Sequence, residues 1–197
     1  MCKKLGVLLV VFSAVSLVVA QAKLDAPFQV RYVANVTATT DSVIDITNSG
    51  ASGGNLCVNV YAFSPDEQEV SCCSCIVTPN GLVSLSAYND LFSNTLTPVR
   101  PTSGVIKLVA TKTSSCNAAT PNGAGNTLAT GLLAWGTTIH NGPAGPQVTE
   151  TAFSPATLSA SEEARITSFC GFAQANGSGF GIRIERMSSP RLTCVRR

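Results

Sequence analysis

The segment Leu56–Phe63, LCVNVYAF, is the most strand-like stretch of the chain and decides its fold. Successive side chains of a β-strand point to opposite faces of the sheet. One predicted face carries Leu56, Val58, Val60 and Ala62, and the other carries Cys57, Asn59, Tyr61 and Phe63. The segment therefore predicts a strand with one fully apolar face.

Alternating patterns recur on both sides of this segment and are separated by short polar turns. Residues 30–37 alternate so that Val30, Tyr32, Ala34 and Val36 share the face better suited to the core. Residues 104–111, GVIKLVAT, are nearly all apolar and predict a central strand. Further strands are predicted at 43–47, 82–87, 128–139 and 148–153.

One helix is predicted near the C-terminal end of the chain. Ser159 and Glu162 have the spacing of a capping box, which marks the start of a helix. An apolar stripe then follows at helical spacing, formed by Ile166, Phe169, Cys170 and Ala173. Many short strands followed by one helix predict a mainly β protein, namely an antiparallel β-sandwich of immunoglobulin-like or related topology with one C-terminal helix.

Residues 1–22 have the order of residues found in a secretory signal peptide. Two lysines precede an apolar stretch over residues 5–20, and small residues follow. Cleavage after Ala20 or Ala22 would make Gln21 or Lys23 the first residue of the mature protein. The apolar stretch is shorter than the ~20 residues of a membrane-spanning helix. We therefore expect an extracytoplasmic protein, periplasmic or extracellular, without a transmembrane anchor after signal cleavage.

The rest of the chain predicts one domain and a short tail. Residues 23–182 suffice for a single disulfide-stabilised β-sandwich domain and carry six basic and ten acidic residues, a net formal charge of −4. Residues 183–197 carry five arginines and one glutamate, a net of +4. We expect a basic, poorly ordered tail whose removal changes stability little. The overall charge of +2 lacks the field of one sign that nucleic-acid binding requires.

Seven cysteines follow the predicted signal peptide: Cys57, Cys72, Cys73, Cys75, Cys116, Cys170 and Cys194. In an exported protein such cysteines tend to form disulfides, so we expect at least two intramolecular bridges. The adjacent Cys72 and Cys73 should send bridges in different directions. Proximity in the sequence suggests that Cys57 meets one member of the 72–75 cluster. The full pairing stays open, and an odd number leaves one cysteine over.

Few residues of the sequence suggest chemistry. His140, the only histidine, follows an apolar strand where a general base can lie, but no G-x-S-x-G motif presents a nucleophile. Trp135, the only tryptophan, is the candidate for carbohydrate or ligand binding. Thiolates of the cysteine cluster with His140 match no standard zinc spacing. Asp66, Glu67 and Glu69 lie in a polar turn without a calcium-loop pattern. No metal and no cofactor are predicted.

Two stretches carry a resemblance to known sequences. Residues 55–81, NLCVNVYAFSPDEQEVSCCSCIVTPNG, and residues 151–170, TAFSPATLSASEEARITSFC, resemble segments of a group of uncharacterised exported bacterial proteins with a similar Cys-Cys-x-Cys cluster. The resemblance covers most of residues 55–182. It ends after Ile182, where the group would have a terminal cysteine at about Arg183. The resemblance implies export from a bacterial cell and no particular activity.

These observations favour a secreted, disulfide-stabilised structural or surface-interaction protein without catalysis. Its partner would be a protein or glycan at the cell surface or in the extracellular medium. Two alternatives stay open. One is a small extracellular hydrolase that uses His140, and the other is a carbohydrate- or ligand-binding module that uses Trp135.

Overall fold

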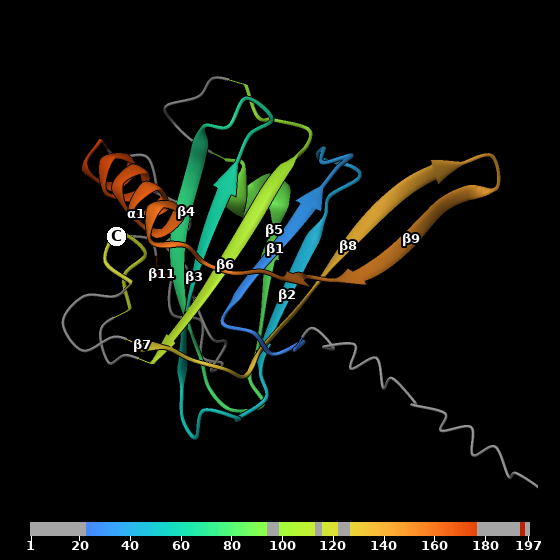
Figure 1. Cartoon of the computed structure of the whole chain (residues 1–197). Coiled ribbons are helices and arrows are strands. Elements are labelled where there is room, and N and C mark those ends of the chain that lie inside the picture. Colours follow the sequence, from blue (N-terminus) through green and yellow to red (C-terminus); the bar gives the residue numbers. More distant parts are fainter. Residues whose placement is uncertain (1–22, 94–98, 113–115, 122–126, 177–193, 196–197) are drawn as a thin grey trace, which may run out of the picture.

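The protein is a sandwich of two antiparallel β-sheets with one helix packed on the outside of the larger sheet (Figure 1). The computed structural model describes residues 23–93, 99–112, 116–121, 127–176 and 194–195. The predicted signal peptide, residues 1–22, lies outside these described residues. The predicted fold class, a mainly β sandwich with one C-terminal helix, is confirmed.

The two sheets differ in size and in the strands that form them. In spatial order, the larger sheet consists of β10 (Ser154–Pro155), β1 (Phe28–Val33), β6 (Gly104–Lys112), β3 (Leu56–Phe63), β4 (Glu69–Val77) and β11 (Cys194–Val195), with β7 (Thr127–Leu128) paired to β6. The smaller sheet consists of β5 (Leu82–Ser86), β2 (Val43–Asn48), β8 (Leu132–Gly142) and β9 (Gly145–Ala152). A π-helical turn, η1 (Ala87–Leu91), follows β5, and the helix is α1 (Ala160–Ala175).

Strands β3 and β6 form the centre of the larger sheet, as their apolar sequences predict. They pair antiparallel with Val60 opposite Leu108, and every residue of β3 is buried. The predicted apolar face of β3 points into the core between the sheets, where it meets Ile44 and Ile46 of β2. The other face belongs to a second apolar cluster outside the sheet. Both faces of this sheet are therefore covered.

The second cluster joins α1 and the segment 116–121 to the outer face of the larger sheet. It contains Phe28, Tyr61, Phe63, Val109, Ala118 and Ile166. Tyr61 is fully buried, and its hydroxyl donates a hydrogen bond to the carbonyl oxygen of Ala118 at 2.7 Å. The molecule thus has three layers, which are the smaller sheet, the larger sheet and the α1 layer (Figure 1).

Two disulfides fasten this outer layer to the sheet. Cys57 of β3 is bonded to Cys116, and Cys72 of β4 is bonded to Cys170 of α1. The bridges link residues that are 59 and 98 positions apart in the sequence. The expectation of at least two intramolecular disulfides is confirmed.

The cysteine cluster in β4 is divided between the two faces of the sheet. Cys72 belongs to the outer cluster, whereas Cys73 and Cys75 are buried in the core between the sheets. Cys72 and Cys73 therefore point in different directions, and Cys72 forms a bridge, whereas a bridge from Cys73 stays a prediction. The expectation that Cys57 meets this cluster is wrong. Cys57 lies opposite Ile76 of β4 and points outward from the sheet, where it is bonded to Cys116 of the segment 116–121.

The face of β1 that points into the core is not the one predicted from its sequence. Val33 is fully buried and Arg31 is only 9% exposed, whereas Tyr32 is 64% exposed. The core accommodates Arg31 because its Nη1 donates to the carbonyl oxygen of Thr151 at 2.8 Å and its Nη2 to Oγ1 of Thr138 at 3.1 Å. As a result, the aromatic ring of Tyr32 lies on the surface.

Helix α1 begins where its capping sequence predicts. The hydroxyl of Ser159 accepts a hydrogen bond from the backbone N–H of Glu162 at 3.2 Å. The carboxylate of Glu162 forms an ion pair with Lys107 of β6, which links the helix to the sheet. Phe169 is 43% exposed, and the helix buries the other three residues of the predicted stripe, Ile166, Cys170 and Ala173.

Strand β11 comes from the tail for which the sequence predicts poor order. It pairs antiparallel with β4, so that Cys194 lies opposite Cys75 and Val195 opposite Ser74. For these two residues the structure differs from the prediction, because the edge of β4 offers backbone groups that pair with them. Residues 183–193 lie outside the described residues, and for them the prediction stays a prediction.

Gly104 is expected to tolerate no side chain. A Cβ atom at this position would lie against the carbonyl oxygen of Phe63 and 2.7 Å from Cζ of Phe92, both in the packed interior. We predict that Gly104→Ala lowers the free energy of unfolding by about 1–3 kcal/mol, the usual cost of overpacking. Urea unfolding followed by circular dichroism measures the change. Gly54→Ala is the matched control, since its Cβ would meet no atom within 4 Å. Equal stability of the two variants would contradict the prediction.

Candidate functional site

The β8–β9 hairpin extends away from the body of the sandwich (Figure 1). An open groove lies between this hairpin and the end of β1. Its volume is about 650 Å³. Its walls come from the end of β1 and the loop that follows it, from the residues before β6, and from the hairpin. The polar groups on these walls belong to Tyr32, Asn35, Thr37, Thr40, Thr102, Ser103, His140 and Asn141. We call this site the Tyr32–His140 groove.

Hydrogen bonds hold the loop wall of the groove in place. The hydroxyl of Thr40 donates to the carbonyl oxygen of Asn35 at 2.7 Å, and the hydroxyl of Thr37 accepts from the backbone N–H of Thr40 at 3.1 Å. The backbone N–H of Val36 donates to the carbonyl oxygen of Thr102 at 2.9 Å, which ties the two loops together. Asn35 has φ = 58°, a left-handed conformation that asparagine tolerates better than most residues. The wall is therefore preformed.

Several side chains of the groove keep their hydrogen-bonding groups available for a ligand. Within the described part of the chain, five of them make no side-chain hydrogen bond: Tyr32, Asn35, Thr102, Ser103 and Asn141. Hydroxyl and amide groups both donate and accept hydrogen bonds. The lining residues include no Asp, Glu, Lys or Arg. The groove is thus polar and lacks carboxylate, ammonium and guanidinium groups.

His140 lies in this groove, on the exposed part of β8. Its Nε2 is 3.1 Å from Oγ1 of Thr149 across the hairpin. A histidine that acts as general base needs a nucleophile within hydrogen-bond reach and a further group that orients the ring, usually a carboxylate. The lining residues of the groove provide no carboxylate. The structure therefore places His140 beside Thr149 in a groove whose lining residues include no carboxylate.

Trp135 lies away from the groove. It is half-buried on the outer face of the smaller sheet, opposite Asp45 of β2 and Ala152 of β9. Its neighbours Leu132 and Ala134 point into the core, which fixes the outward direction of the ring. The structure does not bring Trp135 and His140 into one site.

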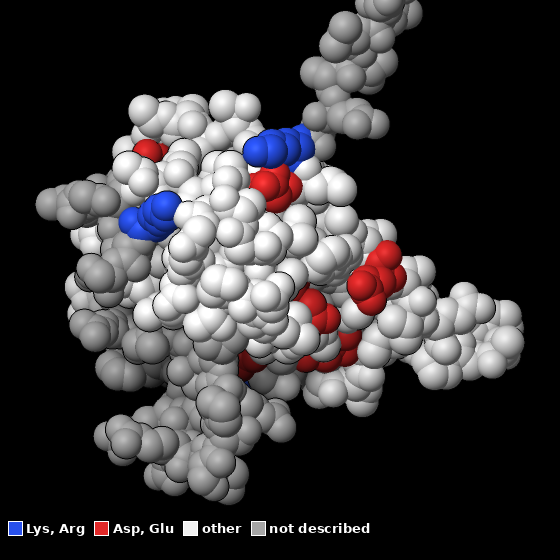
Figure 2. All heavy atoms as spheres, turned by 90° about the horizontal axis from the view of Figure 1, so that it is seen from below, with Lys and Arg blue, Asp and Glu red and all other residues white. Residues whose placement is uncertain are grey.

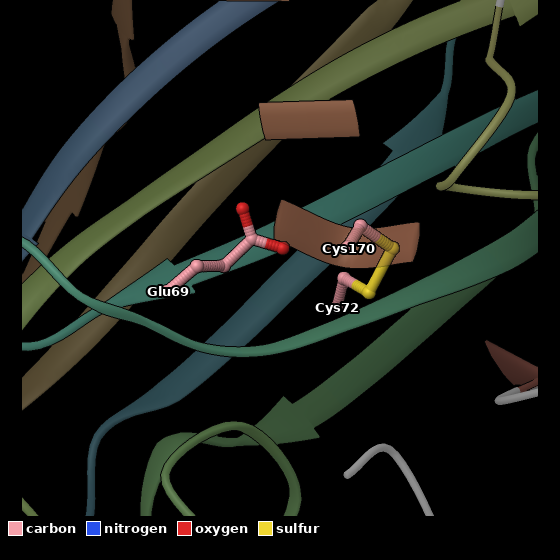
Figure 3. Close-up of side chains that lie close together, drawn as sticks. All are labelled: Glu69, Cys72 and Cys170. Carbon is pink, nitrogen blue, oxygen red and sulfur yellow. A yellow bond between two sulfur atoms is a disulfide. The ribbon is translucent and has the colours of Figure 1, made fainter. Parts of the chain in front are cut away.

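A second cluster of potential ligand atoms lies beneath α1. Figure 3 shows the carboxyl group of Glu69 beside the Cys72–Cys170 disulfide, with atoms of the three residues within 4.8 Å of one another. A metal ion would require the two sulfur atoms as thiolates, but they are bonded to each other. As a disulfide, this cluster offers a metal only one strong ligand, the carboxylate.

Glu69 is nevertheless unusual among the acidic residues. Both carboxyl oxygens are buried and have no hydrogen-bond partner among the described residues. This burial raises the pKa of Glu69 from its usual value of 4.5 to about 9, and Glu162 adds to the rise. Lys107 and Arg165 act in the opposite direction but do not offset the desolvation. Glu69 is therefore protonated and neutral at pH 7.

The surface carries few charged groups. On the face shown in Figure 2, lysine, arginine and acidic side chains are scattered among a majority of uncharged residues. Exposed apolar residues lie on several elements, among them Leu82 on β5, Val148 on β9 and Phe172 on α1. Among the helices of the described residues, none has the length and apolar character needed to cross a membrane.

The sequence indicates His140 but neither the other residues of the groove nor Glu69. The regular alternation of residues 30–37 predicts that Tyr32 points into the core, and this prediction is wrong. A signal for the groove is present in Asn35 and the threonine-rich stretch after it, since Asn and Thr favour turns, and β1 does end at Val33. The burial of Glu69 has no such signal, because its two acidic neighbours suggest a solvated turn.

Comparisons with known proteins identify no family for this chain. No family model matches it, and no curated protein matches it. Among solved structures, the crystal structure of Thermotoga maritima 1070 is similar, with a TM-score of 0.42 and 11% sequence identity. The match covers 68% of this chain and 97% of that one.

Proposed function

We propose that this chain is an exported, disulfide-stabilised interaction protein that binds a partner at the cell surface or in the extracellular medium and catalyses no reaction. The observation that carries the proposal is the Tyr32–His140 groove. It is open and preformed, and it has available donors and acceptors without an accompanying carboxylate. Such a site orients a ligand but supplies no acid–base pair for chemistry.

Export is supported by the two disulfides and by the signal-like residues 1–22. Disulfides persist in oxidising compartments and are rare in the cytosol. In this protein they link the loop at Cys116 and the helix at Cys170 to the sheet, far from the groove. Their contribution is therefore to hold the scaffold together, while the groove and the projecting hairpin stay accessible.

The absence of catalysis is tested with the His140→Ala variant. We expect the unaltered protein and the variant to release product from chromogenic esters, glycosides and peptides no faster than buffer does. The reason is that, within the described residues, the hydrogen-bond partner of the imidazole is the hydroxyl of Thr149, and no carboxylate orients the ring. A rate above buffer that falls about tenfold or more in His140→Ala would overturn the proposal in favour of the hydrolase.

Binding outside the cytoplasm is tested with cells of the native host. The oxidised protein, added to washed cells or to isolated cell-wall material, should sediment with them in a saturable manner. Fractionation with a specific antibody should find the natural protein outside the cytoplasm. A cytoplasmic location would contradict the proposal.

A further inference from the structure

We propose that the Tyr32–His140 groove binds a neutral oligosaccharide segment. This inference rests on the proposed function and names the chemical class of its ligand. It follows from three properties of the groove, which are its neutrality, the type of its hydrogen-bonding groups, and the exposed aromatic ring at its rim.

The neutrality of the groove disfavours a charged ligand. Removing a charged group from water is costly unless a group of opposite charge meets it. The lining residues include no Asp, Glu, Lys or Arg, so a cationic ligand would meet no carboxylate, and an anionic ligand would meet only the imidazole of His140. A neutral polar ligand has no comparable desolvation cost.

The hydrogen-bonding groups match those of a sugar. Each hydroxyl of a sugar both donates and accepts, and so do the side chains of Asn35, Ser103 and Asn141 on three separate wall segments. None of these three side chains is engaged elsewhere within the described residues. A ligand with hydroxyl groups on several sides can therefore contact all three walls.

Tyr32 supplies the apolar contact that a sugar ring also needs. Its side chain is 64% exposed at the rim of the groove, although its two neighbours along β1, Arg31 and Val33, are buried. An aromatic ring offers a large apolar face together with a polar hydroxyl, at a low cost in conformational entropy. The C–H face of a pyranose can stack on this ring while its hydroxyl groups reach the amides.

A peptide fits the groove less well. Peptide recognition relies on apolar pockets for side chains or on an open strand edge that pairs with the peptide backbone. The aliphatic residues that line the groove are Ala34 and Ile139, which form no deep apolar pocket together with so many polar neighbours. Peptide binding is therefore an outcome of the test that would count against the proposal.

The test uses affinity electrophoresis and calorimetry with soluble neutral polysaccharides, namely a β-glucan, a mannan and a xylan, and with oligosaccharides cut from them. Polygalacturonate and an unstructured peptide mixture serve as other ligand classes. We expect at least one neutral glycan to bind and Tyr32→Ala to weaken its binding about tenfold or more, the size of effect seen at contacts that dominate an interface. Tyr32→Phe, which keeps the ring, should lose less affinity.

Phe172→Ala is the matched control for Tyr32→Ala. Phe172 is 67% exposed, close to the 64% of Tyr32, but it lies on α1 and is not among the residues that line the groove. Because Phe172 does not line the groove, this control should leave glycan affinity unchanged, and both variants should keep the thermal midpoint of the parent. A second groove variant, Asn141→Ala, should weaken binding without a change in stability.

Three results would overturn the inference: binding of none of the neutral glycans, binding that Tyr32→Ala and Asn141→Ala leave unchanged, or binding only of the charged polysaccharide or the peptides. These failures are distinct from a failure of the proposed function. Saturable sedimentation with cells together with any of these results would refute the ligand class alone. Turnover that depends on His140 would refute the proposed function itself.

Discussion

The Cys72→Ala/Cys170→Ala variant is expected to lose about 4.7 kcal/mol of its free energy of unfolding. The bridge restricts a loop of 98 residues in the unfolded chain, for which the chain-entropy model gives a stabilisation of this size. The same bridge holds α1 on the larger sheet, where Ile166 and Ala173 are buried. Urea unfolding of the oxidised proteins, followed by circular dichroism and by the fluorescence of Trp135, measures the difference.

The Cys57→Ala/Cys116→Ala variant is the matched comparison. Its bridge spans 59 residues, so chain entropy alone would make its effect smaller by only about 0.5 kcal/mol. It secures a loop rather than a helix, and we expect helix content to fall in the Cys72→Ala/Cys170→Ala variant alone. A loss below about 1 kcal/mol in that variant would contradict the account of the helix layer.

The stability of the protein is expected to fall as the pH rises above about 4.5, because of Glu69. In the folded protein the pKa of Glu69 is about 9, whereas in the unfolded chain the group ionises near 4.5. Below pH 4.5 it is protonated in both states and has no effect on the equilibrium. Between pH 4.5 and 9 only the unfolded state releases the proton, so each pH unit favours unfolding by about 1.4 kcal/mol.

Glu69→Gln should remove this dependence. A neutral amide of the same shape replaces the protonated acid, so we expect the variant to be more stable than the parent by about 3.5 kcal/mol at pH 7 and equal to it near pH 4. Unfolding in urea at a series of pH values gives both curves. Glu67→Gln is the control, because the side chain of Glu67 is 84% exposed in the same turn. Parallel curves for the parent and Glu69→Gln would contradict the burial argument.

The fold is largely predictable from the sequence because its central strands have unambiguous patterns. The alternation in Leu56–Phe63 assigns each residue of β3 to its correct face, and Ser159 marks the start of α1. The prediction of which face of β1 points into the core is wrong. The sequence pattern of this strand does not determine the face, which depends on tertiary contacts. Thr138 and Thr151, more than 100 residues away in sequence, accept hydrogen bonds from Arg31 where it is buried.

The candidate site is less predictable for the same reason. The groove combines residues from three separate segments that local patterns cannot bring together, and the inverted face of β1 moves Tyr32 into it. The sequence predicts that disulfides form, but it does not predict which cysteines pair. Cys57 and Cys72 both face the outer layer, and what they meet there depends on how the loop at Cys116 and α1 pack on the sheet.

We propose that an exported scaffold, tied by disulfides across its layers, presents the groove outside the cytoplasm. Non-reducing peptide mapping of the natural protein from its host is the decisive experiment. We expect a chain that starts at Gln21 or Lys23 and linked peptides for Cys57–Cys116 and Cys72–Cys170. Because Cys75 is disulfide-bonded and lies opposite Cys194, a third linked pair should join these two residues. A chain that keeps Met1 and has six or seven reduced cysteines would contradict the account.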